Sequence, residues 1–474
     1  MILQKLDNVN LDNFPVVIFG SGPAGITTAL ELEKKNIKCL LIEAGGEDYS
    51  ETSQKYYKGK IIGDLIADLS LNRLRQFGGT SGHWGGWSKP REEYNFELWP
   101  LKSNELDPYS KKTCEILDIN HQFRKSSLSE FFNQIEFQYS KVRFADKYKD
   151  HIKNSNSILL VLNTQLSHFV GRNNNTEYAE CISDKTTRKI TAKHFILACG
   201  GIENSRILLW TRDKNQEFID NDLPIGKYWM NHPWILGGVG IINKKKLKKK
   251  LRNNFLEYDG PLHFAAKKEL IIKKNILSAA VYMNAKEDTK IYKEIIKDIL
   301  CVAPKYGKKI ARLIFKKDLK CGNIFMNLED DPNENNKIVL DKEKDEFGIP
   351  MVKLFYKKSE YSLKTAKLFL EEFANLCRKE DLGRIAIKES IYNLEDIDEL
   401  INRGGSGAHH IGGTRMGLDK FDSVINKDLK VHNVNNLYIS GSSNFVTTGY
   451  TNPTFTIIQF ALRLADKIYE RIHA

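Results

Sequence analysis

The stretch Phe14–Gly46, FPVVIFGSGPAGITTALELEKKNIKCLLIEAGG, decides the fold of this chain. Its apolar and turn-forming residues predict a buried strand over residues 16–19, a glycine turn, a helix from residue 26 to about residue 35, and a second strand over residues 38–42. A strand, a helix and a second strand in this order form a βαβ unit with parallel strands. We therefore expect an α/β domain at the start of the chain.

The glycine turn has the spacing G-x-G-x-x-G, with Gly20, Gly22 and Gly25 at the glycine positions. Gly20 permits the tight turn, Gly22 allows a pyrophosphate to approach the backbone, and Gly25 allows the helix to pack closely on the strand. The free N–H groups at the start of the helix attract phosphate oxygens. Glu43, at the end of the second strand, is placed to accept hydrogen bonds from ribose hydroxyls. The unit predicts a dinucleotide site without separating NAD from FAD.

The length and charge of the chain limit its organisation and partners. With 474 residues it exceeds one compact core, so we expect two or three packing units. A net charge of +12 would suit a nucleic-acid partner, but lysines are spread along the whole chain among many acidic residues. The one dense run, Lys244–Lys250 (KKKLKKK), is interpreted as a solvated loop, and no nucleic-acid motif accompanies it. We expect no nucleic-acid partner.

The apolar and cysteine residues favour a cytoplasmic protein. No apolar run approaches the ~18 residues that span a bilayer, and the first residues lack the pattern of a signal peptide. The seven cysteines are scattered and form no C-x-x-C pair, so we expect reduced thiols and no metal site.

A second glycine-rich segment, Phe77–Trp87 (FGGTSGHWGGW), holds five glycines in eleven residues. Such a density suits a backbone pressed against a flat ligand, with N–H groups aimed at the polar edge of that ligand. Two later segments have a strand, a glycine turn and a helix. The first has a strand over residues 194–198 and a helix from about residue 204, and the second lies at the C-terminus.

Together these segments resemble the glucose–methanol–choline (GMC) oxidoreductase family, flavoproteins that oxidise alcohols. The motifs that carry the resemblance are, in order, GSGPAG…IEAGG, GGTSGHWGG, ACGGIENSRILL, GKYWMNHP and HHIGGTRMG…TNPTFTI. The resemblance covers most of the chain and implies FAD bound by N-terminal, central and C-terminal segments. WGGW and GGIENSRILL are most similar to bacterial members that modify sugars and aminoglycosides, which implies a carbohydrate-type alcohol as substrate.

The resemblance also implies a division into two domains. Residues 1–231 and 404–474 would form a Rossmann-like FAD-binding domain of the α/β class. Residues 232–403 would form a substrate-binding domain (α+β) with an antiparallel sheet and helices behind it. The sequence of this middle region agrees, because it has short strand-like runs followed by helical periodicity over residues 362–379. The runs cover residues 275–283, 323–328 and 336–356, the last with a turn at Gly348 and Pro350.

Two adjacent histidines, His409 and His410, are candidates for the catalytic base. Neighbouring side chains point in different directions on a regular backbone, so both are not expected to face one site in the same way. Aligning the family block on Gly413-Thr414 selects His410. Aligning the whole block, with Met416 near its end, selects His409 and places His410 where relatives often have proline. The second alignment matches more positions, so His409 is the predicted base and His410 the second choice.

The family resemblance makes Asn452, in GYTNPTFTI, the second catalytic residue. Oxidation of an alcohol requires removal of the O–H proton and transfer of the C–H hydride to flavin N5. A histidine titrates near neutrality and can accept the proton. An asparagine does not titrate, but it can hold the substrate oxygen and orient the C–H bond. Pro453 fixes the local turn before the last helix, whose N-terminus suits the pyrimidine edge of the flavin.

The residues predicted to hold FAD come from four segments of the chain. They are Gly20, Gly22, Gly25, Glu43, Gly79, Thr80, Gly82, His83, Gly200, Gly441, Pro453 and Thr454. His83 occupies the position at which some family members attach the flavin covalently through histidine. A covalent bond and simple packing of His83 beside the dimethylbenzene ring both stay open.

Other functions also stay open at this point. A non-redox enzyme such as a lyase, or a flavin-stabilised binding protein without turnover, could use the same fold. The electron acceptor, whether oxygen, a quinone or a protein, is not encoded in any motif. The basic segment Lys308–Lys317 (KKIARLIFKK) is interpreted as a surface helix, with a lid or a membrane-surface helix as alternatives.

Overall fold

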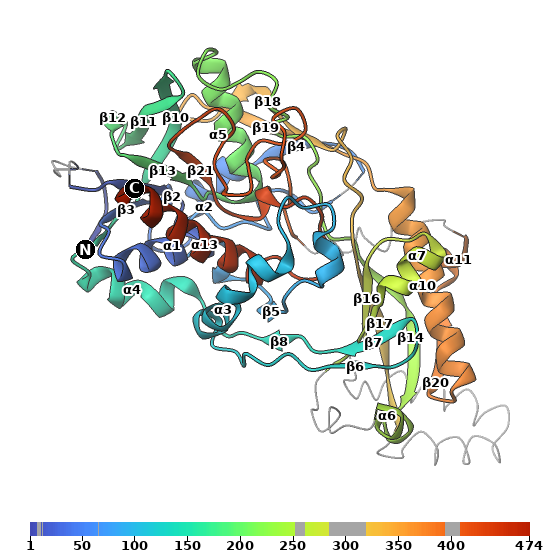
Figure 1. Ribbon diagram of the computed structural model, residues 1–474. Helices are drawn as coiled ribbons and strands as arrows, with labels where there is room; N and C mark the ends of the chain where they lie inside the picture. Colours follow the sequence, from blue (N-terminus) through green and yellow to red (C-terminus); the bar gives the residue numbers. More distant parts are fainter. Residues whose placement is uncertain (7–10, 12, 65, 252–260, 284–318, 394–407) are drawn as a thin grey trace.

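The computed structural model describes the chain except residues 7–10, 12, 65, 252–260, 284–318 and 394–407. Two sheets organise it (Figure 1): a parallel sheet near the N- and C-termini and a large antiparallel sheet that carries the long helix α10 on its outer side. The fold is therefore mixed, with a Rossmann-like unit and an antiparallel unit, in agreement with the predicted class.

The parallel sheet has six strands in the order β1-β9-β3-β2-β13-β21. Every neighbouring pair is parallel. Five of the strands are almost continuously apolar and buried, as expected for a sheet covered on both faces. Their bounds are β1 Ile2–Leu3, β2 Val16–Phe19, β3 Cys39–Ile42, β9 Ile158–Val161, β13 His194–Leu197 and β21 Leu437–Ile439.

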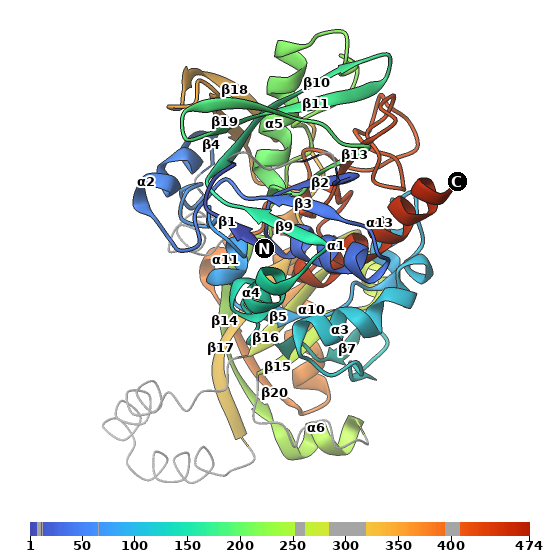
Figure 2. The same cartoon turned by 90° about the vertical axis from the view of Figure 1, so that its left-hand side faces the viewer.

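Different elements cover the two faces of this sheet (Figure 2). Helices α1, α4 and α13 lie on one face, and α1 packs directly against α13. Helix α5 and a three-stranded antiparallel sheet lie on the other face. The helices are α1 Pro23–Lys34, α4 Phe144–Asn154, α5 Gly200–Lys214 and α13 Thr454–His473, and the strands are β10 Thr164–Arg172, β11 Asn175–Ser183 and β12 Thr186–Ile190.

Two helices begin earlier than the sequence pattern predicts. Helix α1 starts at Pro23 rather than residue 26, because proline fits the first position of a helix and Gly22 is its N-cap. Helix α5 starts at Gly200 rather than near residue 204, so the glycine turn itself forms its first turn. Both helices therefore bring their N-terminal N–H groups directly to the end of the preceding strand.

The antiparallel sheet has seven strands in the order β20-β14-β17-β16-β15-β7-β6. One face packs against α10 in a second hydrophobic core, where Phe132, Phe369 and Phe373 are in mutual contact. The bounds are β6 Lys125–Ser127, β7 Phe132–Ile135, β14 Trp234–Asn243, β15 Leu262–Ala266, β16 Ala279–Met283, β17 Leu319–Leu328, β20 Gly383–Ile387 and α10 Glu360–Lys379.

Shorter elements connect these units. The strands are β4 Gly59–Gly63, β5 Trp87–Ser88, β8 Gln138–Tyr139, β18 Lys337–Lys344 and β19 Pro350–Tyr356. The helices are α2 Glu51–Gln54, α3 Ser110–Leu117, α6 Lys244–Leu251, α7 Lys268–Lys274 and α11 Glu389–Asn393. Single 3₁₀ turns are η1 Lys55–Tyr57, η2 Gly79–Gly82, η3 Glu93–Phe96, η4 Ser103–Glu105, η5 Asp107–Tyr109 and η7 Ser442–Asn444.

The two sheets do not follow the predicted domain boundaries at two places. Strands β18 and β19 lie inside the predicted substrate domain, but β19 pairs in parallel with β4. The buried side chains of Val352, Leu354 and Tyr356 belong to the first hydrophobic core, which is formed around the six-stranded parallel sheet. This packing explains the difference. Strands β6 and β7 lie inside the predicted FAD domain, yet they belong to the seven-stranded sheet. The division as a whole stays a prediction.

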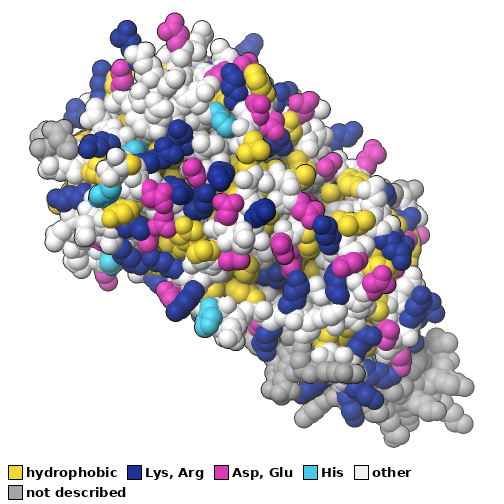
Figure 3. All heavy atoms as spheres, in the orientation of Figure 1, with side chains coloured by type: hydrophobic (Ala, Val, Ile, Leu, Met, Phe, Trp, Pro, Cys, Tyr) yellow, Lys and Arg dark blue, Asp and Glu magenta, His cyan; other side chains and the backbone are white. Residues whose placement is uncertain are grey.

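The lysine run predicted as a loop is helix α6 instead. Leu247 and Leu251 are one helical turn apart and are buried in the second core, so an apolar contact stabilises the helix although its other residues are charged. Positive and negative side chains are intermingled over the face in Figure 3. The segment Lys308–Lys317 lies outside the described residues. Among the described helices, none is both long enough and apolar enough to cross a lipid bilayer.

The second core makes the first prediction. Phe373 is buried between α10 and the sheet, where it contacts Phe132 and Phe264. We expect Phe373→Ala to lower the free energy of unfolding by about 3–5 kcal/mol, because it leaves a cavity in packed surroundings. Urea denaturation measures this loss. Asn375→Ala, an exposed position on the same helix, is the control, and an equal loss in both variants would contradict the packing of α10.

Candidate active site

A cavity of about 510 Å³ opens at the carboxyl edge of the parallel sheet. Four strands end at it: Gly20 follows β2, Glu43 follows β3, Ala198 follows β13 and Ser440 follows β21. Ligands of open parallel sheets bind at this edge, because the strand ends and the helix N-termini meet there. The position and size of the cavity fit a bound nucleotide cofactor.

Glycines form the part of the cavity next to helices α1 and α5. A Cβ atom at Gly22 or Gly200 would project into open space, since no described atom lies within 4 Å of it. Gly25 differs, because its Cβ would lie 1.9 Å from the carbonyl oxygen of Gly20. Gly22 and Gly200 therefore leave room for a ligand, whereas Gly25 serves the packing of helix on strand.

The Glu43 carboxylate is part of the protein's own hydrogen-bond network. Its Oε2 accepts hydrogen bonds from Ser21 N at 3.0 Å and Ser21 Oγ at 2.7 Å, and its Oε1 accepts one from Gly45 N at 2.9 Å. Burial raises the pKa of Glu43. The carboxylate thus fixes the glycine turn, and it also lines the cavity, where it keeps lone pairs that can accept further hydrogen bonds.

Sequence analysis did not predict the residues that follow β9. Thr164, Gln165 and Leu166 line the cavity beside Glu43, because β9 is the neighbour of β3 in the sheet. The Gln165 Oε1 atom accepts a hydrogen bond from Arg75 Nη2 at 2.8 Å. The apolar run of β9 was the available signal, but its place next to β3 depends on the tertiary fold.

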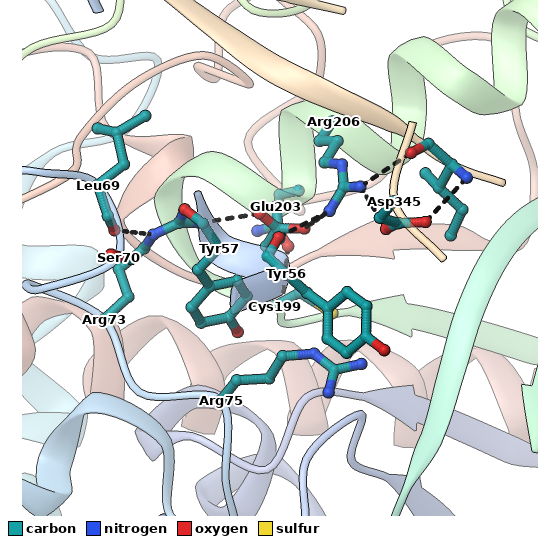
Figure 4. Close-up of polar contacts among 12 residues, drawn as sticks. Tyr56, Tyr57, Leu69, Ser70, Arg73, Arg75, Cys199, Glu203, Arg206 and Asp345 are labelled. Atoms are coloured by element: carbon teal, nitrogen blue, oxygen red, sulfur yellow. Dashed lines mark hydrogen bonds and ion pairs between the residues drawn. The ribbon is translucent and has the colours of Figure 1, made fainter. Parts of the chain in front are cut away.

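A buried network of alternating charges holds the segment that borders the cavity (Figure 4). Arg73 lines the cavity and pairs with Glu203 on α5 at 2.8 Å, and Glu203 pairs with Arg206 at 3.1 Å. Arg206 then pairs with Asp345 of the β18–β19 connection at 2.7 Å. Arg73 also donates to the carbonyl oxygens of Leu69 and Tyr57. Each buried charge has an opposite partner, so the network joins three segments without an unpaired ion.

The same cavity is also lined by the predicted catalytic residues. His409, His410 and Asn452 all line it, together with Pro453 and Thr454 at the start of α13. Both histidines thus reach the same cavity. Their segment is not regular, because Ala408 has a φ of +51°.

The two histidines nevertheless have different contacts. His409 Nδ1 lies 2.7 Å from Nδ1 of His232, in GKYWMNHP. Both ring nitrogens of His410 are buried without a hydrogen-bond partner in the described part of the chain, and its ring lies 5.8 Å from that of Trp229. Burial lowers the pKa of His410 to about 3 and that of His409 well below its usual value. Both rings are therefore neutral near pH 7.

The structure brings ten of the twelve predicted cofactor residues to one cavity. Gly25 is absent from its lining for the reason given above, and Gly82 faces Leu74 and Gln76 instead. His83 is exposed at the cavity. The ten residues are Gly20, Gly22, Glu43, Gly79, Thr80, His83, Gly200, Gly441, Pro453 and Thr454.

The fold and the cavity define a nucleotide-binding protein of the Rossmann type. Residues 332–461 match the family model described as GMC oxidoreductase. The match lies in the C-terminal part of the chain, which is therefore similar to GMC oxidoreductases.

Named relatives agree with this assignment. The chain is 27% identical over 299 residues to the fructose dehydrogenase large subunit of Gluconobacter japonicus, a match that covers 60% of this chain and 48% of that protein. It is 30% identical over 142 residues to paromamine 6'-oxidase of Streptomyces fradiae, covering 30% of this chain and 24% of that protein. The longer of these matches spans about half of the relative's length.

A solved structure shares the whole fold. Formate oxidase of Aspergillus oryzae superimposes with a TM-score of 0.60 over 97% of this chain and 98% of that chain, at 15% sequence identity. GMC oxidoreductases bind FAD, and the open glycine positions, the acidic residue at the end of β3 and the unpartnered nitrogens of His410 fit that cofactor.

The glycines make a prediction that separates binding from folding. Gly22 has a φ of −76°, which any residue adopts, so Gly22→Val should fold normally and fill the space of the cofactor. We expect FAD per chain to fall at least tenfold with little change in the stability of the apoprotein. Absorbance and urea denaturation measure both quantities. Gly25→Val is the matched variant and should instead destabilise the apoprotein. Normal FAD content in Gly22→Val would contradict this assignment of the cavity.

Proposed function

We propose that this chain is an FAD-dependent oxidoreductase that oxidises the CH–OH group of an alcohol, with His409 as the base and Asn452 as the residue that holds the substrate oxygen. One observation carries the proposal. His409, Asn452 and the N-terminus of α13 line the same cavity as the glycine turn and Glu43.

His409 has the properties of a base that is ready to act. Burial and the neighbouring histidines lower its pKa, so the ring is neutral at working pH and can accept the hydroxyl proton of an alcohol. When bound, FAD would supply the acceptor for the hydride of the C–H bond. The ring of His409 is held by a contact with His232, which limits its freedom to rotate.

Asn452 and the start of α13 line the same cavity as His409. The Asn452 amide can donate a hydrogen bond to the substrate oxygen without changing its charge. Pro453 is the N-cap of α13, so the free N–H groups of the first helical turn lie at the cavity. These groups and the partial positive charge of the helix favour negative charge on a bound ligand.

The substrate class is proposed from the names of the relatives. The relatives include proteins named fructose dehydrogenase and paromamine 6'-oxidase, which supports a carbohydrate-type alcohol. The electron acceptor and a covalent bond through His83 stay open, and the cytoplasmic location stays a prediction. A lyase or a non-catalytic binding protein on the same fold is separated from the proposal by mixing the FAD-loaded protein with sugars, glycosides and simple alcohols without oxygen. Loss of flavin colour supports oxidation, and no loss with any of them contradicts it.

Removal of the base tests the assignment of residues. His409→Ala should keep FAD and slow flavin reduction about 10²-fold or more, because the hydroxyl proton has no acceptor. Asn452→Ala should also slow it, through misorientation of the alcohol. Anaerobic stopped-flow absorbance at saturating substrate gives both rate constants.

His410→Ala is the control for this pair. It should have a smaller effect, because the His410 ring contacts Trp229 and no described residue makes a hydrogen bond to its ring nitrogens that would hold it as a base. Loss of flavin reduction in His410→Ala with near-normal reduction in His409→Ala would reverse the assignment.

The low pKa of His409 predicts the pH dependence of the same step. A histidine whose pKa lies well below 6.5 stays unprotonated as the pH falls from about 8 to about 6.5. We therefore expect the rate constant of flavin reduction to be constant over this range and to fall only in more acidic solution. Stopped-flow measurements across the range provide the test. A decline with an apparent pKa near 7 would contradict the expectation that burial keeps His409 neutral over this range.

A further inference from the structure

We propose that His232 is a positioning residue that fixes the tautomer of His409, so that Nε2 of His409 carries a free lone pair for the substrate proton. The inference rests on the proposed function, in which His409 is the base. His232 lies in the motif GKYWMNHP, and the sequence pattern predicts no role for it. The structure supplies one, because His232 lies against His409 although 177 positions separate them.

The first step concerns Nε2 of His232. It lies 2.9 Å from the carbonyl oxygen of Gly449 and 3.2 Å from that of Thr448. Carbonyl oxygens only accept hydrogen bonds. The Nε2 atom of His232 must therefore carry a hydrogen and donate it to these two carbonyls.

The second step concerns the charge of His232. The ring is buried, and burial together with the nearby Arg91 guanidinium lowers the pKa of His232 to about 4. A neutral imidazole has one N–H, and here that N–H is at Nε2. Nδ1 of His232 is consequently a bare nitrogen that accepts a hydrogen bond.

The third step concerns the tautomer of His409. The two Nδ1 atoms are 2.7 Å apart, a distance that requires a hydrogen between them. Since Nδ1 of His232 has none, Nδ1 of His409 must donate. The single N–H of neutral His409 is then at Nδ1, and its Nε2 is left as the base. The opposite polarity would put the N–H of His409 at Nε2 and block proton acceptance.

The backbone fixes the same arrangement. Asn231 Oδ1 accepts hydrogen bonds from His232 N at 2.9 Å and from His409 N at 3.2 Å. Asn231 N in turn donates to Asp330 at 3.1 Å. The two imidazole rings meet edge to face at 87°, with 4.9 Å between their centroids. The backbone N–H groups of both histidines thus bind one asparagine side chain, which holds the two segments next to each other.

The contact also favours the protonated product of the base. After Nε2 of His409 accepts the hydroxyl proton, the ring is an imidazolium with hydrogens on both nitrogens. Its Nδ1–H still donates to the bare Nδ1 of His232, and a hydrogen bond from a charged donor is stronger than one from a neutral donor. His232 therefore acts through His409, and it touches neither the proton nor the alcohol.

A double-mutant cycle in the FAD-loaded enzyme tests this. We expect His232→Leu to lower the rate constant of flavin reduction about 10²-fold at saturating substrate, since a misplaced tautomer disables a histidine base. In a His409→Ala background the same change should have no further effect. An equal decrease in both backgrounds would overturn the proposal, because His232 would then act independently of His409.

Two further variants keep this cycle interpretable. His232→Asn places Oδ1 near the position of Nδ1, so it should recover a measurable part of the rate lost in His232→Leu, and no recovery would count against the tautomer role. His194→Leu makes the same chemical change at the start of β13, away from the cavity, and should leave the rate unchanged. All compared variants must have the FAD content of the starting protein.

A measurement without turnover separates this inference from the proposed function. In FAD-loaded protein with ¹⁵N-labelled histidine, the signals of His409 are those absent from His409→Asn. We expect Nδ1 of His409 to have the chemical shift of a protonated ring nitrogen and Nε2 that of a bare one. The reverse assignment overturns the inference even if alcohols reduce the flavin. The expected assignment together with no reduction by any alcohol would overturn the proposed function alone.

Discussion

The cavity depends on the close approach of backbone segments that are distant in the sequence. A Cβ at Gly45 would lie 2.1 Å from the carbonyl oxygen of Arg75, and a Cβ at Gly201 would lie 2.1 Å from that of His410. Side chains at these glycines would push the segments apart. The first contact fixes the segment before the second glycine-rich motif beside β3. The second fixes the histidine segment on the N-terminal turn of α5. Both walls of the cavity thus result from missing side chains.

Electrostatics then decides what the walls can do. Arg73, Glu203, Arg206 and Asp345 are buried, and each has an oppositely charged partner, so this side of the cavity is rigid and its charges are balanced. Among the described residues, His409 and His232 form no ion pair. Burial keeps their rings neutral, and the carbonyl oxygens around His232 orient their hydrogens. Paired ions therefore stabilise the segment around Arg73, while His409 and His232 make their contacts through neutral donors and acceptors.

The antiparallel sheet contributes through the segment that precedes Asn452. Gly449 N donates to Glu329 at the end of β17, and Asp330 N donates to Thr448 at 2.8 Å. Tyr450 donates to the buried Glu92 carboxylate at 2.6 Å. The residues just before Asn452 are thus fixed by both units of the protein, which explains how a loop can place an amide at the cavity with little freedom.

Local sequence determined much of this protein. The strand, the glycine turn and the helix around Gly20, Gly22 and Gly25 follow from residue types a few positions apart, because such patterns constrain the backbone directly. The motif around Asn452 and the start of α13 could be predicted for the same reason, and ten of the twelve residues that the family resemblance implied for the cofactor line the cavity. Only the tertiary structure decided the rest. The contact of His232 with His409, the place of β9 beside β3 and the packing of β18 and β19 on the first core join residues far apart in the chain. No local pattern encodes which elements become neighbours, since that depends on how all the apolar faces are buried together.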